Sequence, residues 1–283
     1  MVELLKALMK LSRIEHGVMV AIGVIAGAVS SGSIESLSSK GTHIVLGSLA
    51  AILIEMGLFT FNDVFNIEED KVNSPDRPLV RGCIGIREAS LFGALTLIVG
   101  MLLSLIIGPI SFILILLVVM LGMAYNVSLK RKGFLGNVAV AFNTAMPFVY
   151  GALLMSNITG IILLFYLMAF FSALGREVIK GIKDLRGDIR VGTKTLAAKY
   201  GSLIAARIAA SFIVIAVIMS PLPILLVKNP IGYTTLILLT DTLLLYSSYK
   251  IVVNPDEKEA DKQRKITLLA MGAGIVGFAL SNL

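Results

Sequence analysis

The sequence has few charged residues, no tryptophan and a single cysteine. Charged residues make up 15% of the 283 positions, whereas a soluble domain has about 25%, so the composition excludes a soluble globular fold. The lone Cys83 excludes an intrachain disulfide. Hydrophobic residues make up 57% of the chain, which indicates an integral membrane protein. We attribute the net charge of +7 to basic loops beside the membrane rather than to a nucleic-acid site.

Apolar runs with the length of a membrane-spanning helix, about 20 residues, recur along the chain. Gly108-Pro109 divides one long run and Ser156-Asn157 divides another, because these residue types mark turns. We predict nine transmembrane helices around a central cavity, in a single all-α domain of residues 1–283. They lie within 16–34, 42–62, 89–129, 133–175, 208–227, 231–249 and 266–283, with two helices in each of the runs 89–129 and 133–175.

The distribution of lysine and arginine supports this count. When the segments between nine helices alternate across the membrane, one side holds only Lys40 and Lys228, which leaves 23 of the 25 basic residues on the other. Cytoplasmic loops carry such an excess. We therefore expect a multi-pass protein of the cell membrane with a cytoplasmic N-terminus.

Two of the predicted cytoplasmic segments are rich in acids as well as in bases. The first reads NDVFNIEEDKVNSPDRP over residues 62–78, and the second reads REVIKGIKDLRGD over residues 176–188. If the helix that enters the first segment continues through Asp70, then Asn62, Asn66 and Asp70 lie on one helical face. Asp184 and Asp188 are also four residues apart. We expect both clusters at a similar depth on the cytoplasmic side.

Oxygen ligands without nearby histidine or cysteine favour Mg²⁺ over Zn²⁺, and interleaved lysine and arginine favour phosphate. Both fit a diphosphate with a long hydrocarbon tail, because ionising an allylic diphosphate develops charge that metal ions and cations must neutralise. The predicted metal ligands are Asn62, Asp63, Asn66, Asp70, Asp184 and Asp188, and all but Asp63 are also predicted to be catalytic. The predicted phosphate or diphosphate ligands are Lys71, Arg77, Lys130, Arg176 and Lys180.

Both segments resemble signatures of the UbiA superfamily of intramembrane prenyltransferases. The first resembles NDxxDxxxD followed by RP, and the second, which continues as GTKT at 192–195, resembles the other signature. Nine helices also match the superfamily, so the resemblance covers nearly the whole chain. The sequence departs from the pattern at Asn66, where the family usually has Asp, and this removes one negative ligand from the first metal site. It also has Gly181 where many archaeal-type members have a further Asp.

The runs at 70–78 and 176–180 are similar to the archaeal ether-lipid branch, the digeranylgeranylglyceryl phosphate synthases. This resemblance implies Mg²⁺-dependent transfer of a geranylgeranyl group from geranylgeranyl diphosphate to the free hydroxyl of geranylgeranylglyceryl phosphate, with substrates entering from the membrane lipids. Two alternatives stay open at this point. One is a prenyltransferase that acts on an aromatic quinone or tetrapyrrole precursor, and the other is a membrane transporter with basic gating loops.

Several other polar residues lie in or beside the predicted spans. Arg13, Tyr125 and Asn143 are predicted to contact substrate, although Arg13 can instead pair with Glu15, Tyr125 can mark the membrane interface, and Asn143 can bond a neighbouring helix. Glu55 and Asp241 are interpreted as helix-packing groups. No role is assigned to His16, His43 and Cys83, which do not form a metal-binding set.

Overall fold

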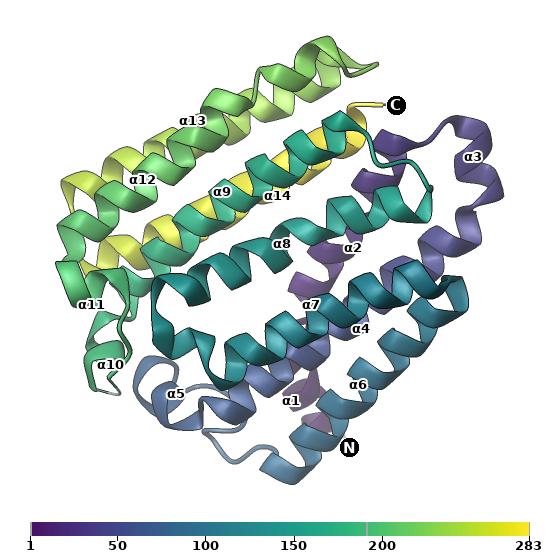
Figure 1. Ribbon diagram of the computed structural model, residues 1–283. Helices are drawn as coiled ribbons and strands as arrows, with labels where there is room; N and C mark the ends of the chain where they lie inside the picture. Colours follow the sequence, from purple (N-terminus) through teal and green to yellow (C-terminus); the bar gives the residue numbers. More distant parts are fainter. Residues whose placement is uncertain (1, 191, 283) are drawn as a thin grey trace.

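The computed structural model describes residues 2–190 and 192–282, and within these ranges the secondary structure is helical, with no strand (Figure 1). The long helices are α2 (Ile14–Ser31), α4 (Gly41–Phe65), α6 (Ile86–Ile107), α7 (Pro109–Val127), α8 (Phe134–Leu154), α9 (Gly160–Lys183), α12 (Ser202–Met219), α13 (Pro230–Val253) and α14 (Glu257–Leu280). The short elements are α1 (Val2–Ser12), α3 (Ile34–Ser39), α5 (Ile67–Asn73), α10 (Leu185–Arg190), α11 (Leu196–Tyr200) and the 3₁₀ turns η1 (Leu129–Lys132) and η2 (Leu222–Leu225).

The two breaks predicted inside the long apolar runs are confirmed. Gly108 separates α6 from α7 with a φ of 155°, and Pro109 opens α7, where its missing N–H leaves no helical hydrogen bond unmade. The second run breaks between Leu154 and Gly160, around Ser156 with its positive φ of 56°. Each break returns the chain through the membrane as an antiparallel neighbour.

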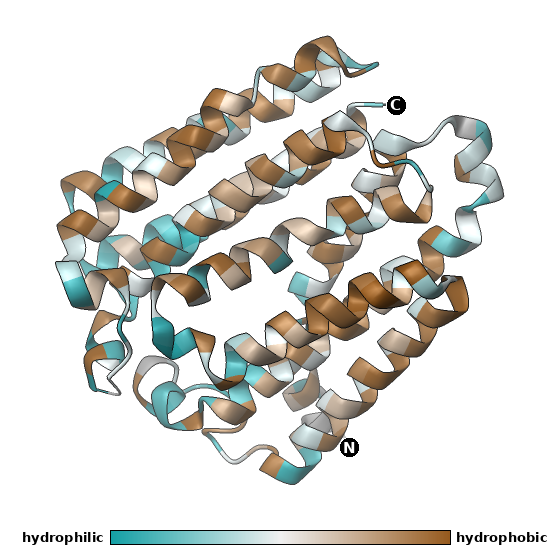
Figure 2. Cartoon of the chain, in the orientation of Figure 1, coloured by the Kyte–Doolittle hydropathy of each residue, from teal (hydrophilic) through white to brown (hydrophobic). Residues whose placement is uncertain are grey.

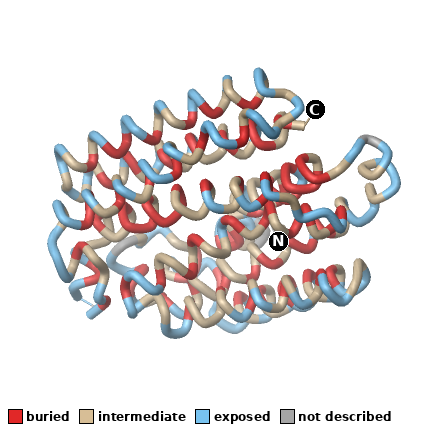
Figure 3. The backbone as a smooth tube through the Cα atoms, turned by 45° about the horizontal axis from the view of Figure 1, so that its top comes forward, coloured by how far each residue is buried: buried red, intermediate tan, exposed pale blue. Residues whose placement is uncertain are grey.

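The all-helical membrane fold is confirmed, and eight helices in the described part of the chain are long and apolar enough to cross a bilayer. Figure 2 shows the apolar residues along the helices and hydrophilic residues around α5 and α10. Large side chains such as Leu91, Ile106 and Ile218 are 63–71% exposed, and exposed residues follow the outer faces in Figure 3. Lipid covers such surfaces in a membrane protein. The first turns of α14 carry charge, so the ninth span stays a prediction. The cytoplasmic N-terminus also stays a prediction.

The nine long helices of the described residues form a closed ring. Each packs against the next long helix along the chain, from α2 and α4 through to α13 and α14, and α14 packs against α2. Further contacts cross the ring, and the most extensive of them join α2 to α8 and α9 to α14. The central space therefore lies inside a ring of helices.

Two glycines close this space at the end far from α5 and α10. A Cβ on Gly27 of α2 would lie 2.2 Å from the Phe148 carbonyl oxygen, and one on Gly151 of α8 would lie 1.9 Å from the Val24 carbonyl oxygen. Only glycine permits so close an approach of the two backbones. The contact leaves the remaining cavity open toward the end that carries the acidic segments.

Candidate active site

The first acidic segment does not continue the helix before it, and the prediction of one helical face for Asn62, Asn66 and Asp70 is wrong. Helix α4 ends at Phe65, and Asn66 has φ −117° and ψ 25° before α5 begins at Ile67. The Asn66 side-chain amide donates to the Asn62 carbonyl oxygen at 2.6 Å, a local bond that competes with the helical backbone pattern. The break turns Asp70 onto a separate helix.

Arg77 holds the two halves of this segment together. Its guanidinium donates to Asp63 Oδ1 at 2.5 Å and also forms a short ion pair with Asp70. Both carboxylates are buried, at 2% and 5% exposed. Burial raises the pKa of Asp70 to about 6, against the opposing charge of Arg77. Arg77, predicted to bind phosphate, therefore bridges two predicted metal ligands in this structure.

The N-terminal helices contribute a second arginine to the same carboxylate. Arg13, at the junction of α1 and α2, has a left-handed backbone with φ 47° and donates to Asp63 Oδ1 at 2.8 Å. Its guanidinium also lies 4.3 Å from the centre of the Phe59 ring, a cation–π contact. The open alternative of an Arg13–Glu15 pair is replaced by this pair with Asp63, fifty residues away.

Glu69, which was not predicted to have a role, is buried at 4% exposed and forms a short ion pair with Lys130. Among the described residues its Oε1 has no hydrogen-bond partner. Lys130 follows α7, so this pair ties the loop after α7 to α5. Lys71, by contrast, is half exposed and bonds Glu68 at 2.6 Å on the surface. Because Glu69 stands next to Asp70 in the sequence, it could have been considered as a site residue, but its burial depends on the tertiary fold.

The second acidic segment forms the last turns of α9 and continues, after Asp184, into the short helix α10. Asp184 accepts a bond from Lys183 at 3.0 Å, and the Asp188 backbone N–H donates to the Asp184 carbonyl oxygen at 3.0 Å. Asp188 is 6% exposed, and no hydrogen bond or ion pair from the described residues reaches its carboxylate. Burial, together with the charges of Asp184 and Glu69, raises the pKa of Asp188 to about 7.

The two acidic segments meet, as predicted, at one end of the ring (Figure 1). Helix α10 packs against α5, and Asp188 is close enough to Glu69, Lys130 and Lys180 to interact electrostatically with each. Gly133 fixes the intervening loop, because its φ is 64° and a Cβ there would lie 1.9 Å from the Lys194 carbonyl oxygen. Segments more than a hundred residues apart thus form one polar cap.

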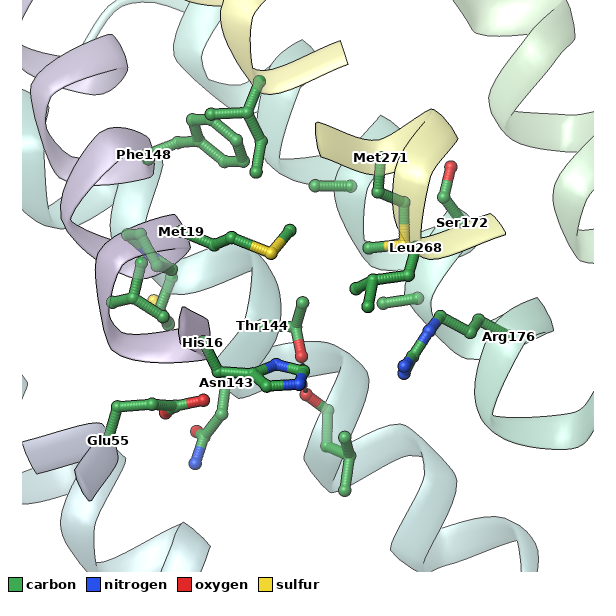
Figure 4. A pocket seen from close by; sticks show the side chains of 18 of the residues that line it. His16, Met19, Glu55, Asn143, Thr144, Phe148, Ser172, Arg176, Leu268 and Met271 are labelled. Carbon is green, nitrogen blue, oxygen red and sulfur yellow. Dashed lines mark hydrogen bonds between the residues drawn. The ribbon is translucent and has the colours of Figure 1, made fainter. Parts of the chain in front are cut away.

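A cavity of about 300 Å³ runs from this cap into the ring. Its polar end is lined by Arg13, Asn62, Tyr125, Arg176 and Lys180, and its apolar end includes Phe148, Ile237 and Phe278. In Figure 4 His16 and Arg176 extend into the cavity from different helices. His16 and Arg264 also line it. The sequence offered no signal for either, because His16 has no second histidine or cysteine near it and Arg264 is one of several basic residues in its segment.

The other predicted substrate contacts border the same space. Asn126 accepts a bond from the Asn62 amide at 2.8 Å and donates to the Leu58 carbonyl oxygen at 3.0 Å, which fixes Asn62 beside Tyr125. Asn143 donates to the Val118 carbonyl oxygen at 3.1 Å while it lines the cavity, so it bonds a neighbouring helix, and its contact with substrate stays a prediction. Glu55 and Asp241 line the cavity as well, and Asp241 accepts a bond from Ser220 at 2.6 Å.

The polar cap has the chemistry of a magnesium site. Its donors are carboxylate and amide oxygens, the set that Mg²⁺ prefers. One oxygen of Glu69 is buried without a partner among the described residues, as expected where a cation is missing from the neighbourhood. Within the described ranges no three acidic, histidine or cysteine side chains converge on one point, because Arg77 and Lys130 occupy several of the acids.

The model of a family described as the UbiA prenyltransferase family matches residues 18–271. The chain belongs to this family. It is 38% identical to the digeranylgeranylglyceryl phosphate synthase of Archaeoglobus fulgidus over 97% of this chain and 94% of that protein. It is 36% identical to the synthase of the same name from Saccharolobus solfataricus over 99% of this chain and 98% of that protein.

Solved structures support the same assignment of fold. One, from work on digeranylgeranylglyceryl phosphate synthase in membranes, is 28% identical and matches with a TM-score of 0.74 over 99% of this chain and 98% of that chain. Another, a UbiA homologue from Archaeoglobus fulgidus bound to GPP and Mg²⁺, is 18% identical with a TM-score of 0.67 over 96% of this chain and 99% of that chain. At that lower identity the match concerns the fold alone. The chain is an integral, multi-pass membrane protein of the UbiA family.

Proposed function

We propose that this UbiA-family enzyme transfers a geranylgeranyl group from geranylgeranyl diphosphate to the free hydroxyl of geranylgeranylglyceryl phosphate, which gives digeranylgeranylglyceryl phosphate and diphosphate. The observation that carries the proposal is the joining of two buried acidic segments and several cations at the mouth of a mainly apolar cavity. The names of relatives that match nearly the whole chain support the glycerophosphate acceptor.

Mg²⁺ fits the polar cap, and the residues that would hold it are the predicted set. They are Asn62, Asp63, Asn66, Asp70, Asp184 and Asp188. When bound, the metal supplies Lewis-acid charge that stabilises a leaving diphosphate. Arg77 now occupies Asp63 and Asp70. Its guanidinium would release those carboxylates to the metal and bind diphosphate oxygens instead, since arginine recognises phosphate with two parallel hydrogen bonds.

We infer an ionisation-first mechanism, because neither acidic segment contains a histidine and the nearby carboxylates would be occupied by the metal. The carbon–oxygen bond of the allylic diphosphate breaks, and the electron pair leaves with the diphosphate toward Arg77 and Lys130. A lone pair of the neutral acceptor hydroxyl then forms the new ether bond, and its proton passes to the released diphosphate. The buried cap and the ring of helices exclude water, which would otherwise trap the cation.

The topology that we propose places the cap on the cytoplasmic face of the cell membrane. Most of the basic residues lie on the same predicted side as both acidic segments, in line with the positive-inside rule. The apolar cavity would hold the prenyl chains, and lipid-soluble substrates would enter from the bilayer. The product would return to the bilayer by the same route.

A test of the function is the incubation of purified enzyme and labelled geranylgeranyl diphosphate with a panel of acceptors. We expect Mg²⁺-dependent labelling of geranylgeranylglyceryl phosphate in preference to an aromatic quinone precursor or a tetrapyrrole precursor. Preferential labelling of an aromatic acceptor would overturn the acceptor assignment. Substrate-dependent transport without any transfer would favour the transporter alternative.

A fluorinated donor tests the order of bond breaking and bond making. Fluorine at the allylic position withdraws electrons and destabilises a carbocation, so we expect it to slow the chemical step strongly. An equal rate with the fluorinated donor, under conditions where chemistry limits turnover, would contradict the ionisation-first mechanism.

A further inference from the structure

A pair of arginines on facing helices lies inside the cavity and is not among the predicted magnesium ligands. Arg176 belongs to α9 and Arg264 to α14, and both line the same space. Their side chains are 14% and 27% exposed. Within the described part of the chain, the Nε–H of each is buried and has no hydrogen-bond acceptor. Two buried Nε–H donors that lack acceptors are the pattern expected of a site that receives an anion between α9 and α14.

The charges around this pair leave a net positive balance. Arg176 and Arg264 are close enough to repel each other electrostatically, which is costly in a partly buried site unless an anion lies nearby. Glu177 bonds Arg176 at 3.2 Å, and Asp261 bonds Arg264 at 3.0 Å. With Lys180 on Glu177 and Lys265 on Asp261, four cations face two acids. The remaining two positive charges match a phosphate monoester, which carries about −1.5 to −2 at pH 7.

This arginine pair is separate from the cations of the cap. Arg77 and Lys130 are ion-paired with acids of α4 and α5, where the donor diphosphate is proposed to bind. Lys180 and Tyr125 lie between the two groups, because Lys180 interacts with both Glu177 and Asp184, and Tyr125 with both Glu177 and Asp188. A second phosphate at the arginine pair would therefore adjoin the diphosphate without sharing its ligands.

We propose that Arg176 and Arg264 bind the phosphate of the glycerophosphate acceptor, and that this contact selects a phosphorylated acceptor and positions its hydroxyl. The inference rests on the proposed function, because it assigns one phosphate of that reaction to one pair of residues. The phosphate and the hydroxyl of the acceptor belong to one three-carbon unit. Binding of the phosphate therefore restricts the hydroxyl to the neighbourhood of the donor carbon, beside Lys180 and Tyr125.

The test compares Arg264→Gln with wild type on two acceptors that differ only in the phosphate, geranylgeranylglyceryl phosphate and geranylgeranylglycerol. We expect kcat/KM for the phosphorylated acceptor to fall by about 10- to 100-fold, the loss of one hydrogen-bonded charge contact. The donor KM and the rate with the unphosphorylated acceptor should stay unchanged. Arg264→Lys should recover part of the loss, since it keeps the charge but loses the planar fork. Lys262→Gln, an exposed neighbour on α14, is the matched control and should behave as wild type.

A second measurement separates this inference from the proposed function. Calorimetric binding of glycerol 1-phosphate to the full-length enzyme without donor should weaken in Arg264→Gln and not in Lys262→Gln. If wild type fails to prenylate the phosphorylated acceptor yet binds glycerol phosphate through Arg264, the proposed function fails and the phosphate site stands. An equal loss on both acceptors, a raised donor KM, or glycerol phosphate binding that is insensitive to Arg264 would overturn the site.

Discussion

Replacing Asp188 by asparagine should make the metal-free protein more stable while abolishing its activity. The carboxyl is 6% exposed, and its pKa is raised from 3.8 to about 7, chiefly by burial and then by Asp184 and Glu69. A folded-state pKa above the unfolded value destabilises the fold as pH rises between the two values. The penalty is roughly 4 kcal/mol at pH 7 and less than half of that at pH 5. Asparagine keeps the shape and removes the charge.

The assay is thermal unfolding in detergent with EDTA, at pH 5 and pH 7, together with turnover in Mg²⁺. We expect Asp188→Asn to raise the unfolding midpoint at pH 7 by at least ~4 °C, with a smaller gain at pH 5, and to lose nearly all turnover. Asp184→Asn is the matched control, because Asp184 is already paired with Lys183 at 3.0 Å. It should lose turnover and gain less stability than Asp188→Asn, because it loses the pair with Lys183 while it relieves only part of the repulsion on Asp188. A destabilised Asp188→Asn, or one with near-normal turnover, would refute the reasoning.

Three further predictions follow from the same cap and cavity. Burial raises the pKa of Asp70 to about 6 and that of Asp188 to about 7, so Mg²⁺ must displace protons from these carboxyls when it binds. The affinity for Mg²⁺, measured by calorimetry, should therefore rise from pH 6 to pH 8. An affinity that does not change with pH would contradict Asp70 and Asp188 as metal ligands. His16→Gln should slow turnover by less than about tenfold, because a donor that has already ionised reacts with the neutral acceptor hydroxyl and no strong base is needed. A 10²- to 10⁴-fold loss of turnover would instead identify His16 as a general base. Gly133→Ala should lower both the unfolding midpoint and turnover, since the added Cβ would lie 1.9 Å from the Lys194 carbonyl oxygen. Wild-type values of both would show that the loop around Gly133 does not position the polar cap.

Local sequence signals identified the helices and their main breaks. Gly108-Pro109 ends one helix and starts the next because the two residues restrict the backbone themselves, whatever surrounds them. The break at Asn66 was not predicted, since no glycine or proline marks it in the sequence and a side-chain bond to the Asn62 carbonyl oxygen interrupts the helix. That bond depends on the local conformation and leaves no periodic trace in the sequence.

The residue types of the site were predictable, but their partners were not. The motifs predicted that Asp70 and Asp188 lie at the same end of the molecule, and the contact between α5 and α10 agrees with this. The pairing of Arg77 with two acids, and of Lys130 with Glu69, depends on how helices distant in sequence pack. Arg264 is one of many basic residues in the sequence, and its position near Arg176 follows only from the packing of α14 against α9.

The central claim is the transfer of a prenyl group to a hydroxyl oxygen, and one isotope measurement tests it most directly. The enzyme is incubated in Mg²⁺ with geranylgeranyl diphosphate and geranylgeranylglyceryl phosphate that carries ¹⁸O in its free hydroxyl, and the products are analysed by mass spectrometry. We expect the label to stay in the new ether of digeranylgeranylglyceryl phosphate and the released diphosphate to be unlabelled. Label that appears in a phosphorylated product through a new phosphorus–oxygen bond, or the absence of any diether, would contradict it.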